Sequence, residues 1–144
     1  MKILLLTHRF TPALGGVETW AEALATGLSE RDHEVLVLSR DDRASSTAAP
    51  FSVREEPRAG FRVCWVRHIH AYDRDYRDSW NDLRLGTALG EVLDSFAPDI
   101  LHVGHCDGWG VAPFNLSGGR DIPCVVTLHD YKWICARGQM IRPP

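Results

Sequence analysis

Two consecutive glycines, Gly15 and Gly16, stand directly before a segment whose apolar residues have helical spacing. Glycine allows a ligand to approach the backbone closely, and the free N–H groups at a helix N-terminus attract an anion. The pair therefore fits a phosphate or diphosphate, although a flexible strand-to-helix turn would use the same residues. The pattern is neither GxGxxG nor a P-loop. Glu18 lies in the first turn of this helix, where the helix dipole alone would favour a carboxylate.

His129 and Asp130 follow an apolar run at 125–128 that has the character of a buried strand. A histidine at a strand end suits proton transfer or a hydrogen bond to a sugar hydroxyl, because its usual pKa is close to neutral pH. The same histidine could equally cap the strand through backbone hydrogen bonds. Asp130 could orient the imidazole or cap the segment that follows it.

The other histidines divide into residues that suit a ligand-binding edge and residues that do not. His105 follows Gly104 at the end of an apolar run and is well placed for a cleft, whereas His102 lies inside that run and is typical of a core histidine. His68 and His70 have no third ligand at metal spacing, so no metal site is predicted. Four aromatic residues could stack on a sugar ring or equally belong to the core: Tyr72, Tyr76, Trp80 and Trp109.

Two periodicities predict the elements that would position these residues. Short apolar runs without alternation are typical of strands buried on both faces of a parallel sheet. Such runs occur at 2–7, 34–39, 99–104 and 124–128, and we expect all four strands to be parallel and central. Apolar residues that recur every three or four positions predict amphipathic helices at 17–30, 80–96 and 111–116.

The alternation of strands and helices predicts an α/β fold, a Rossmann-like, doubly wound and mainly parallel sheet with helices on both faces. Residues 51–56 and 61–66 are interpreted as a hairpin, or as an edge strand beside a central one, and 40–50 as a surface loop. In such sheets ligands bind outside the carboxyl ends of the strands. This rule adds His8, at the end of the first strand, to the candidate site.

Composition excludes several other classes of protein. The chain has 144 residues and 16 Lys and Arg against 19 Asp and Glu, a net charge of -3 that argues against a nucleic-acid groove. No apolar run reaches the roughly 18 residues of a membrane span, and the apolar start is too short for a signal peptide, so a cytoplasmic location is expected. The four cysteines show no CxxC pairing, which favours reduced thiols packed as small hydrophobes.

Several segments, in this order and spacing, resemble the N-terminal domain of GT-B glycosyltransferases of family 4. They are FTP at 10–12, GGVE at 15–18, DHEV at 32–35, PDILHVGH at 98–105 and IPCVVTLHD at 122–130. The resemblance covers nearly the whole chain. One departure is Asp32, which stands where the family usually has glycine.

The resemblance implies one half of a GT-B fold, in which two Rossmann-like domains face each other across a cleft. The N-terminal domain mainly binds the acceptor, and the C-terminal domain binds the nucleotide-sugar donor. The sugar is transferred with retention of configuration and without an essential metal or other cofactor. Carried over, the catalytic position falls on His129 and the donor-phosphate loop on Gly15 and Gly16. Candidate acceptor or cleft contacts are His8, Glu18, His105, Trp109 and Asp130.

Residues 1–144 are therefore expected to form an acceptor-binding domain, incomplete at its C-terminal end, with the donor domain absent. Such a domain is inactive in isolation, and the acceptor could be a glycan, a lipid or a small molecule, with peripheral membrane contact in the lipid case. Two alternatives stay open: an independent flavodoxin-like or nucleotide-binding module, and a non-catalytic partner subunit. The first would favour an acidic cluster after the first strand or a GxGxxG turn, neither of which is present here.

Overall fold

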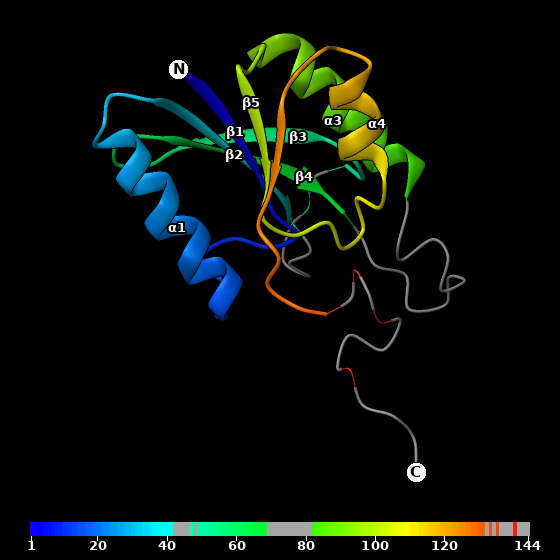
Figure 1. Ribbon diagram of the computed structural model, residues 1–144, viewed down its shortest axis with the longest axis horizontal. Coiled ribbons are helices and arrows are strands. Elements are labelled where there is room, and N and C mark those ends of the chain that lie inside the picture. Colours follow the sequence, from blue (N-terminus) through cyan, green and yellow to red (C-terminus); the bar gives the residue numbers. More distant parts are fainter. Residues whose placement is uncertain are drawn as a thin grey trace.

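Nine helices and strands are defined in the computed structural model, which describes residues 1–41, 47, 49–68, 82–131, 133, 135 and 140. Six strands form one sheet in the order β3-β4-β2-β1-β5-β6 (Figure 1). The strands are β1 (Lys2–Leu6), β2 (Glu34–Asp41), β3 (Val53–Pro57), β4 (Arg62–Arg67), β5 (Ile100–Val103) and β6 (Cys124–Val126). The helices are α1 (Gly16–Ser29), α3 (Leu83–Phe96) and α4 (Ala112–Gly118).

The sheet is parallel except at one edge. β1 pairs in parallel with β2 and with β5, β2 pairs in parallel with β4, and β5 with β6, whereas β3 runs antiparallel to β4. The expected Rossmann-like α/β fold is confirmed. Both interpretations of residues 51–66 hold at once, because β3 and β4 form a hairpin in which β3 is the edge strand and β4 lies inside the sheet.

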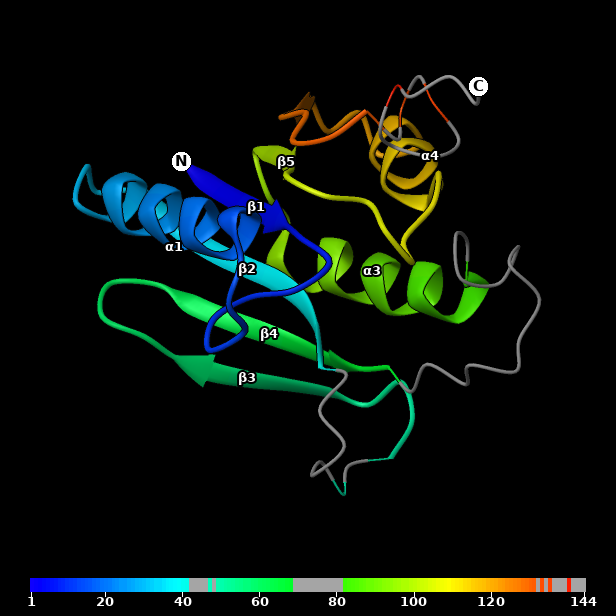
Figure 2. The same ribbon diagram turned by 90° about the horizontal axis from the view of Figure 1, so that it is seen from below.

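Helices cover both faces of the sheet and enclose two separate cores (Figure 2). On one face α3 packs over alternate residues of the central strands, such as Leu4 and Leu36. On the other face α1 packs over the intervening residues, such as Leu5 and Val37. The uninterrupted apolar character of the central strands follows from this arrangement, because both faces of the sheet are buried.

The apolar stripe predicted for helix α3 faces the core. All six predicted stripe positions are buried: Leu85, Ala88, Leu89, Val92, Leu93 and Phe96. The helix begins after Asp82, whose carboxylate accepts a hydrogen bond from the backbone N–H of Arg84 at 3.0 Å. It ends at Ala97, which adopts the left-handed conformation with φ of 48°, just before Pro98.

Helix α1 is less deeply buried than its stripe predicts. Ala21 and Ala25 are fully buried, but Leu24 and Leu28 are only half-buried against the core. The small residues make the fully buried part of the contact with the sheet. The larger side chains of the stripe pack against the rim of the same core and stay partly exposed.

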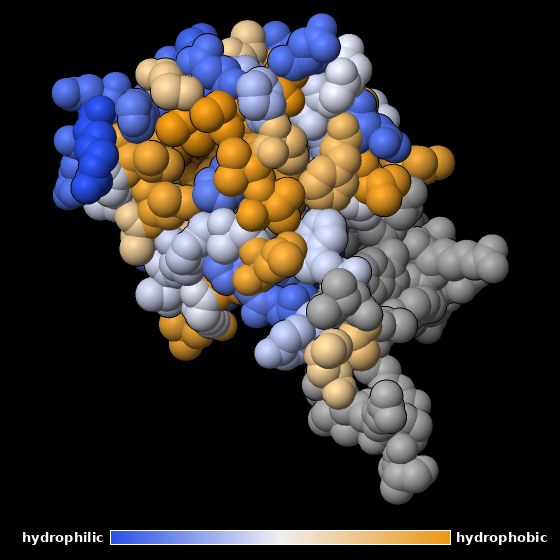
Figure 3. Space-filling view, in the orientation of Figure 1, coloured by the Kyte–Doolittle hydropathy of each residue, from blue (hydrophilic) through white to orange (hydrophobic). Residues whose placement is uncertain are grey.

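Strand β6 corrects one expectation, because it is parallel but not central. It pairs with β5 alone and forms the edge of the described sheet, with Val125 46% exposed and Leu128, just beyond it, 62% exposed. Hydrophobic side chains gather across the middle of the face seen in Figure 3, where β6 crosses the molecule in Figure 1. An apolar run without alternation here marks an exposed edge rather than a strand buried on both sides.

The predicted loop at 40–50 is also corrected in part. β2 continues two residues further than expected, and its last residues, Arg40 and Asp41, are buried. Tyr72, Tyr76 and Trp80, which could stack on a sugar or belong to the core, lie outside the described residues, together with most of the irregular segment 68–79.

All four cysteines are free thiols, and Cys64 is buried in the core, where burial raises the pKa of its thiol to about 12. The expectation of small packed hydrophobes holds for Cys64, whereas Cys124 is exposed. None of the helices in the part of the chain that the structure describes is long and apolar enough to cross a membrane.

Candidate functional site

Histidines from three neighbouring strand ends meet at the carboxyl edge of the sheet. His8 follows β1, His105 follows β5 and His129 follows β6, and these strands are adjacent in the order β1-β5-β6. The rings of His8 and His105 lie with their centroids 4.1 Å apart. The parallel topology therefore brings together candidates that are more than a hundred residues apart in the sequence.

His105 is held by hydrogen bonds on both ring nitrogens. The backbone N–H of Asp107 donates to Nδ1 at 3.2 Å, and Nε2 lies 3.1 Å from the Oδ2 atom of Asp130. Because Nδ1 accepts a hydrogen bond, the proton of a neutral imidazole lies on Nε2 and is donated to Asp130. Asp130 thus orients His105 rather than its sequence neighbour His129.

Glu18 links the glycine pair to His8. Its buried carboxylate lies 4.0 Å from Nε2 of His8 and occupies the space that a side chain on Gly15 would need. Nothing lies within 4 Å of the corresponding position on Gly16. Gly15 is therefore accounted for by packing against Glu18, whereas Gly16 leaves open space in front of the helix.

Among the described residues no side chain forms a capping hydrogen bond at the N-terminus of α1, which begins at Gly16. Backbone N–H groups of a first helical turn have no partner within the helix, so an anion placed here would be favoured by both hydrogen bonds and the dipole. The local structure is compatible with the phosphate interpretation of the Gly15-Gly16 turn.

His129 packs against Trp20 of α1 and carries an unsatisfied polar atom. The two rings meet edge to face with centroids 4.4 Å apart. The Nε2 atom of His129 is buried and has no hydrogen-bond partner among the described residues. Buried polar atoms of side chains are normally paired, so this nitrogen is a position at which a ligand can supply the missing bond.

The pKa of His129 lies below its usual value. Burial is the largest cause, and the positive charge of a protonated His105 acts in the same direction, while Asp130 acts in the opposite direction. Both main causes disfavour the charged imidazolium. His129 is therefore held neutral at neutral pH and can donate or accept a hydrogen bond.

His102 lies beside Trp20, as His129 does, and is joined to Thr127. Trp20 also contacts the ring of His102, at 5.6 Å between centroids, and His102 forms a 2.8 Å hydrogen bond between its Nε2 and the hydroxyl of Thr127. His102 is a satisfied, half-buried histidine, as its place inside an apolar run indicates. Its hydrogen bond joins β5 to the segment that carries His129.

Trp109 does not line the site. It is fully buried in the core on the α3 face, and its indole N–H donates to the backbone carbonyl of Thr7 at 3.2 Å. Its ring offers no exposed face on which a sugar could stack, so its expected contact with a ligand does not fit its position. Trp109 instead fixes the backbone immediately before His8.

Sequence reasoning missed the charged residues at the end of β2. Arg40 is 3% exposed and donates from Nε to the backbone carbonyl of His8 at 3.1 Å. Asp41, 5% exposed, follows it. The rule that parallel sheets bind ligands at carboxyl strand ends would have selected both residues if β2 had been extended by two positions.

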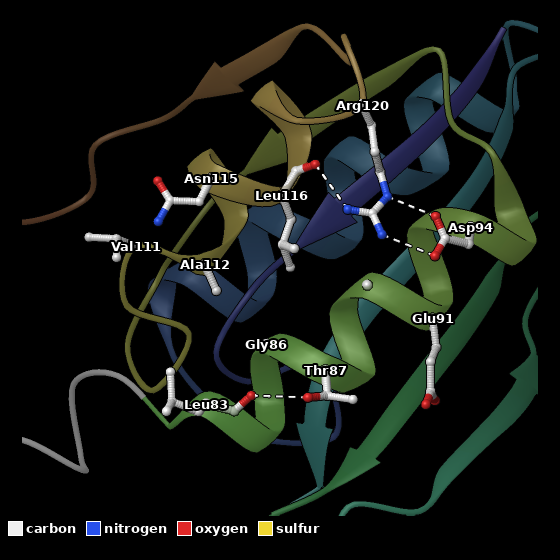
Figure 4. Close-up of a pocket in the computed structure, with 11 residues that line it drawn as sticks. Leu83, Gly86, Thr87, Glu91, Asp94, Val111, Ala112, Asn115, Leu116 and Arg120 are labelled. Atoms are coloured by element: carbon white, nitrogen blue, oxygen red, sulfur yellow. Dashed lines mark hydrogen bonds and ion pairs between the residues drawn. The ribbon is translucent and has the colours of Figure 1, made fainter.

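A separate groove of about 650 Å³ lies between α3 and α4 (Figure 4). Gly86, Gly90 and Ala112 line it with small residues, and the ion pair of Arg120 with Asp94, at 2.7 and 3.0 Å, closes one end. None of the lining residues in the described part of the chain is a histidine or a cysteine. The groove follows from the packing of small residues and has no chemistry comparable to the histidine cluster.

In the described residues no three His, Cys, Asp or Glu side chains are arranged to hold a metal ion. What the carboxyl edge offers is a neutral imidazole, an oriented second imidazole and an open helix N-terminus. The mainly parallel α/β sheet that carries these groups at its carboxyl edge defines a Rossmann-like domain.

The sequence model of Glycosyltransferase Family 4 matches residues 14–140, and the chain belongs to this family. A solved structure described as trehalose-6-phosphate from E. coli bound with UDP-2-fluoro glucose is similar with a TM-score of 0.44 and 9% identity. The similarity covers 73% of this chain and 27% of the other, so this chain spans about a quarter of that length. No curated protein matches the chain.

Proposed function

We propose that this chain is the acceptor-side domain of a retaining glycosyltransferase that transfers a sugar from a nucleotide-sugar to a glycan, lipid or small-molecule acceptor. Membership of Glycosyltransferase Family 4 supports the reaction class. The observation that carries the assignment of the site is the buried, unpartnered Nε2 atom of His129 at the carboxyl edge of the sheet.

In this proposal His129 forms a hydrogen bond to the transferred sugar. Its lowered pKa keeps the imidazole neutral, so no positive charge opposes the charge that develops on the sugar ring in an oxocarbenium-like transition state. Trp20 holds the ring from one side, which limits its orientation before the substrate arrives. A preorganised contact of this kind commonly contributes about 10²- to 10³-fold in rate.

The nucleotide-sugar is a co-substrate, and its nucleotide binds to a second domain that faces this edge in the parent enzyme. The open N-terminus of α1 at Gly16 would face the donor diphosphate, which its N–H groups favour. The 144-residue chain alone is then expected to bind acceptor weakly and to transfer nothing. We propose a cytoplasmic location for the parent enzyme, with peripheral membrane contact if the acceptor is a lipid.

The test measures donor turnover by the parent enzyme with the substitution His129→Ala. Turnover should fall by about 10²- to 10³-fold while the thermal unfolding midpoint stays close to that of the parent. The matched control is His33→Ala, because His33 lies between α1 and β2 at the opposite edge of the sheet. Its turnover should be unchanged.

Near-parental turnover of His129→Ala would remove this residue from the mechanism. Turnover by the isolated chain would overturn the assignment of the donor site to a second domain. A parent protein that turns over no nucleotide-sugar would favour the non-catalytic partner subunit instead.

A further inference from the structure

The guanidinium of Arg40, near the end of β2, contacts the segments that follow three other strands. Its Nε donates to the carbonyl of His8 after β1 at 3.1 Å, and its Nη1 lies 3.5 Å from Nδ1 of His68 after β4. Gly108, in the loop after β5, leaves room for it, because a Cβ atom there would lie 2.5 Å from Nη1. A buried charge is costly unless the protein supplies its hydrogen bonds, so these contacts restrict where the Arg40 side chain, only 3% exposed, can lie.

His68 connects this guanidinium to the start of α3. A guanidinium only donates hydrogen bonds, so Nδ1 of His68 accepts from Arg40 and the proton of the neutral ring lies on Nε2. This Nε2 atom is 3.4 Å from Oδ2 of Asp82. The Asp82 carboxylate is itself held, because it accepts from the backbone N–H, Nε and Nη2 of Arg84 at 3.0, 2.9 and 2.7 Å. The far side of the Arg40 guanidinium is therefore fixed to the N-terminus of a helix.

Two side chains from other parts of the sheet hold the backbone that follows β1. The indole N–H of Trp109 donates to the carbonyl of Thr7 at 3.2 Å, and Arg40 donates to the next carbonyl, that of His8. Two successive carbonyl groups are thus bonded from different directions. This restrains the backbone from which the His8 ring projects, and that ring lies with its centroid 4.1 Å from the centroid of the His105 ring.

We propose that Arg40 is a positioning residue of the candidate site, which fixes the backbone of His8 and thereby the paired rings of His8 and His105 beside His129. The link to sugar transfer rests on the proposed glycosyltransferase function. Because β2 lies on the other side of β1 from β5 and β6, Arg40 acts through His8 rather than on the transferred sugar. His105 in turn interacts electrostatically with His129, so a displaced His105 changes the surroundings of the imidazole assigned to the sugar.

The first test compares the NMR signals of the His8 and His105 rings in the 144-residue chain and in its Arg40→Lys variant, well below their unfolding midpoints. Lysine keeps the charge, but one ammonium group cannot replace both the Nε donor to His8 and the Nη1 donor to His68. The signals of both rings should shift, and the cross-relaxation between the two rings should weaken. Signals that stay at the parent positions would overturn the proposal.

Two controls separate positioning from a general loss of stability. Leu89→Ala removes core packing on α3, so it should lower the unfolding midpoint and leave both histidine ring signals in place. Arg67→Lys is chemically matched, because Arg67 is a buried arginine whose Nη1 donates to the carbonyl of Asp41 rather than to His8. If either control shifts the two rings as much as Arg40→Lys does, Arg40 has only a structural role.

The unsubstituted chain provides a readout that does not depend on the folding of a variant. The Nε proton of Arg40 is buried and bonded to the His8 carbonyl, so it should exchange with solvent at least about tenfold more slowly than the Nε proton of the exposed Arg31. Equal exchange rates would show that the Arg40–His8 hydrogen bond is not maintained in solution, and the proposal would fail.

Kinetics of the parent enzyme test the consequence for the reaction. Arg40→Lys should lower kcat by up to about 10²-fold, the effect of a small displacement of catalytic groups. The KM for the donor should change by less than about twofold, because Arg40 does not touch the substrate in this proposal. Arg40→Lys combined with His129→Ala should cost less than the product of the two single effects, since both act through the same histidine cluster. Fully multiplicative effects would contradict this route.

The two sets of measurements separate this inference from the proposed function. If His129→Ala lowers turnover but Arg40→Lys changes neither kcat nor the ring signals, the positioning role is wrong and the glycosyltransferase function stands. If the ring signals shift while kcat of an active parent enzyme is unchanged, Arg40 has no role in the reaction. If the ring signals shift and the parent protein turns over no nucleotide-sugar, Arg40 positions the histidines and the proposed function is wrong.

Discussion

The ring of Trp20 occupies the space in which Gly104 would otherwise carry a side chain. A Cβ atom at Gly104 would lie 2.5 Å from Cζ3 of the indole, and the same indole packs against His129. The backbone N–H of Gly104 donates to the carbonyl of Leu6 at 2.8 Å, and this hydrogen bond restrains the backbone of Gly104 from moving away from Trp20. Because residue 104 has no side chain, Trp20 can pack at the end of β5, and in this position it contacts His129.

We predict that Gly104→Ala destabilises the fold by about 1–3 kcal/mol, the usual effect of overpacking. The added methyl group must push Trp20 toward His129, so the NMR signals of the His129 ring should shift as well. Gly118→Ala is the control, because nothing lies within 4 Å of that position. Combining Gly104→Ala with Trp20→Leu should recover part of the lost stability in a double-mutant cycle. Strictly additive effects would contradict the contact.

The core of the fold could be predicted from the sequence, and the edge of the sheet formed by β6 could not. Apolar periodicity identifies α3 and the central strands because each of these elements is buried against other elements of the same chain. β6 has the same apolar composition but only one neighbouring strand in the described sheet. Periodicity reports which side chains avoid water and does not report how many strands lie beside them, so the edge position of β6 was not visible.

The sequence predicted which strand ends carry the candidate site, but not which of its side chains form hydrogen bonds with each other. The strand-end rule brings His8, His105 and His129 together without any knowledge of distances. It does not reveal that Asp130 bonds to His105, because the direction of a side chain depends on local turns. Sequence reasoning also missed Arg40, since charged residues after a strand normally indicate a solvated loop.

Core burial predicts unequal effects of two leucine substitutions. Leu89 is fully buried on α3, and Leu89→Ala should lower the free energy of unfolding by about 2–5 kcal/mol. Leu24 is half-buried on α1, so Leu24→Ala should cost only about 1–2 kcal/mol. Urea denaturation at constant m-value measures both. A larger loss for Leu24→Ala would mean that α1 carries more of the core than its packing indicates.

The C-cap residue of α3, Ala97, is a position at which a substitution should stabilise the fold. Ala97 is exposed and has φ of 48°, a conformation that glycine adopts without steric conflict. Ala97→Gly should therefore raise the free energy of unfolding by up to about 1 kcal/mol. The same change at Ala23, an exposed position inside α1, should lower it by about 0.5–1 kcal/mol. Thermal unfolding of the two variants should move in opposite directions, and a shift of the same sign would exclude this account.

His129 should titrate below the usual histidine pKa of about 6.5. Burial is the main cause, and the two charged neighbours act in opposite directions, since His105 lowers the pKa and Asp130 raises it. An NMR titration of the ring protons measures the midpoint directly. His105→Gln should raise the midpoint, and Asp130→Asn should lower it further. A parent midpoint at or above 6.5, or variants that move the same way, would contradict the described environment.

The same lowered pKa fixes the direction of a stability change with pH. Between the folded and unfolded pKa values of His129 the unfolded chain binds more protons than the folded one, so stability decreases as pH falls. The loss begins near the unfolded value of about 6.5 and is complete below the folded value, where both states are protonated. His129→Gln removes this proton-binding difference, so its stability should depend less on pH in that window than the parent's does. Urea midpoints of the two proteins, measured in parallel from pH 7.5 downward, should converge as acid is added if the parent is the more stable at neutral pH. Parallel curves would show that His129 has the same pKa in the folded and unfolded states.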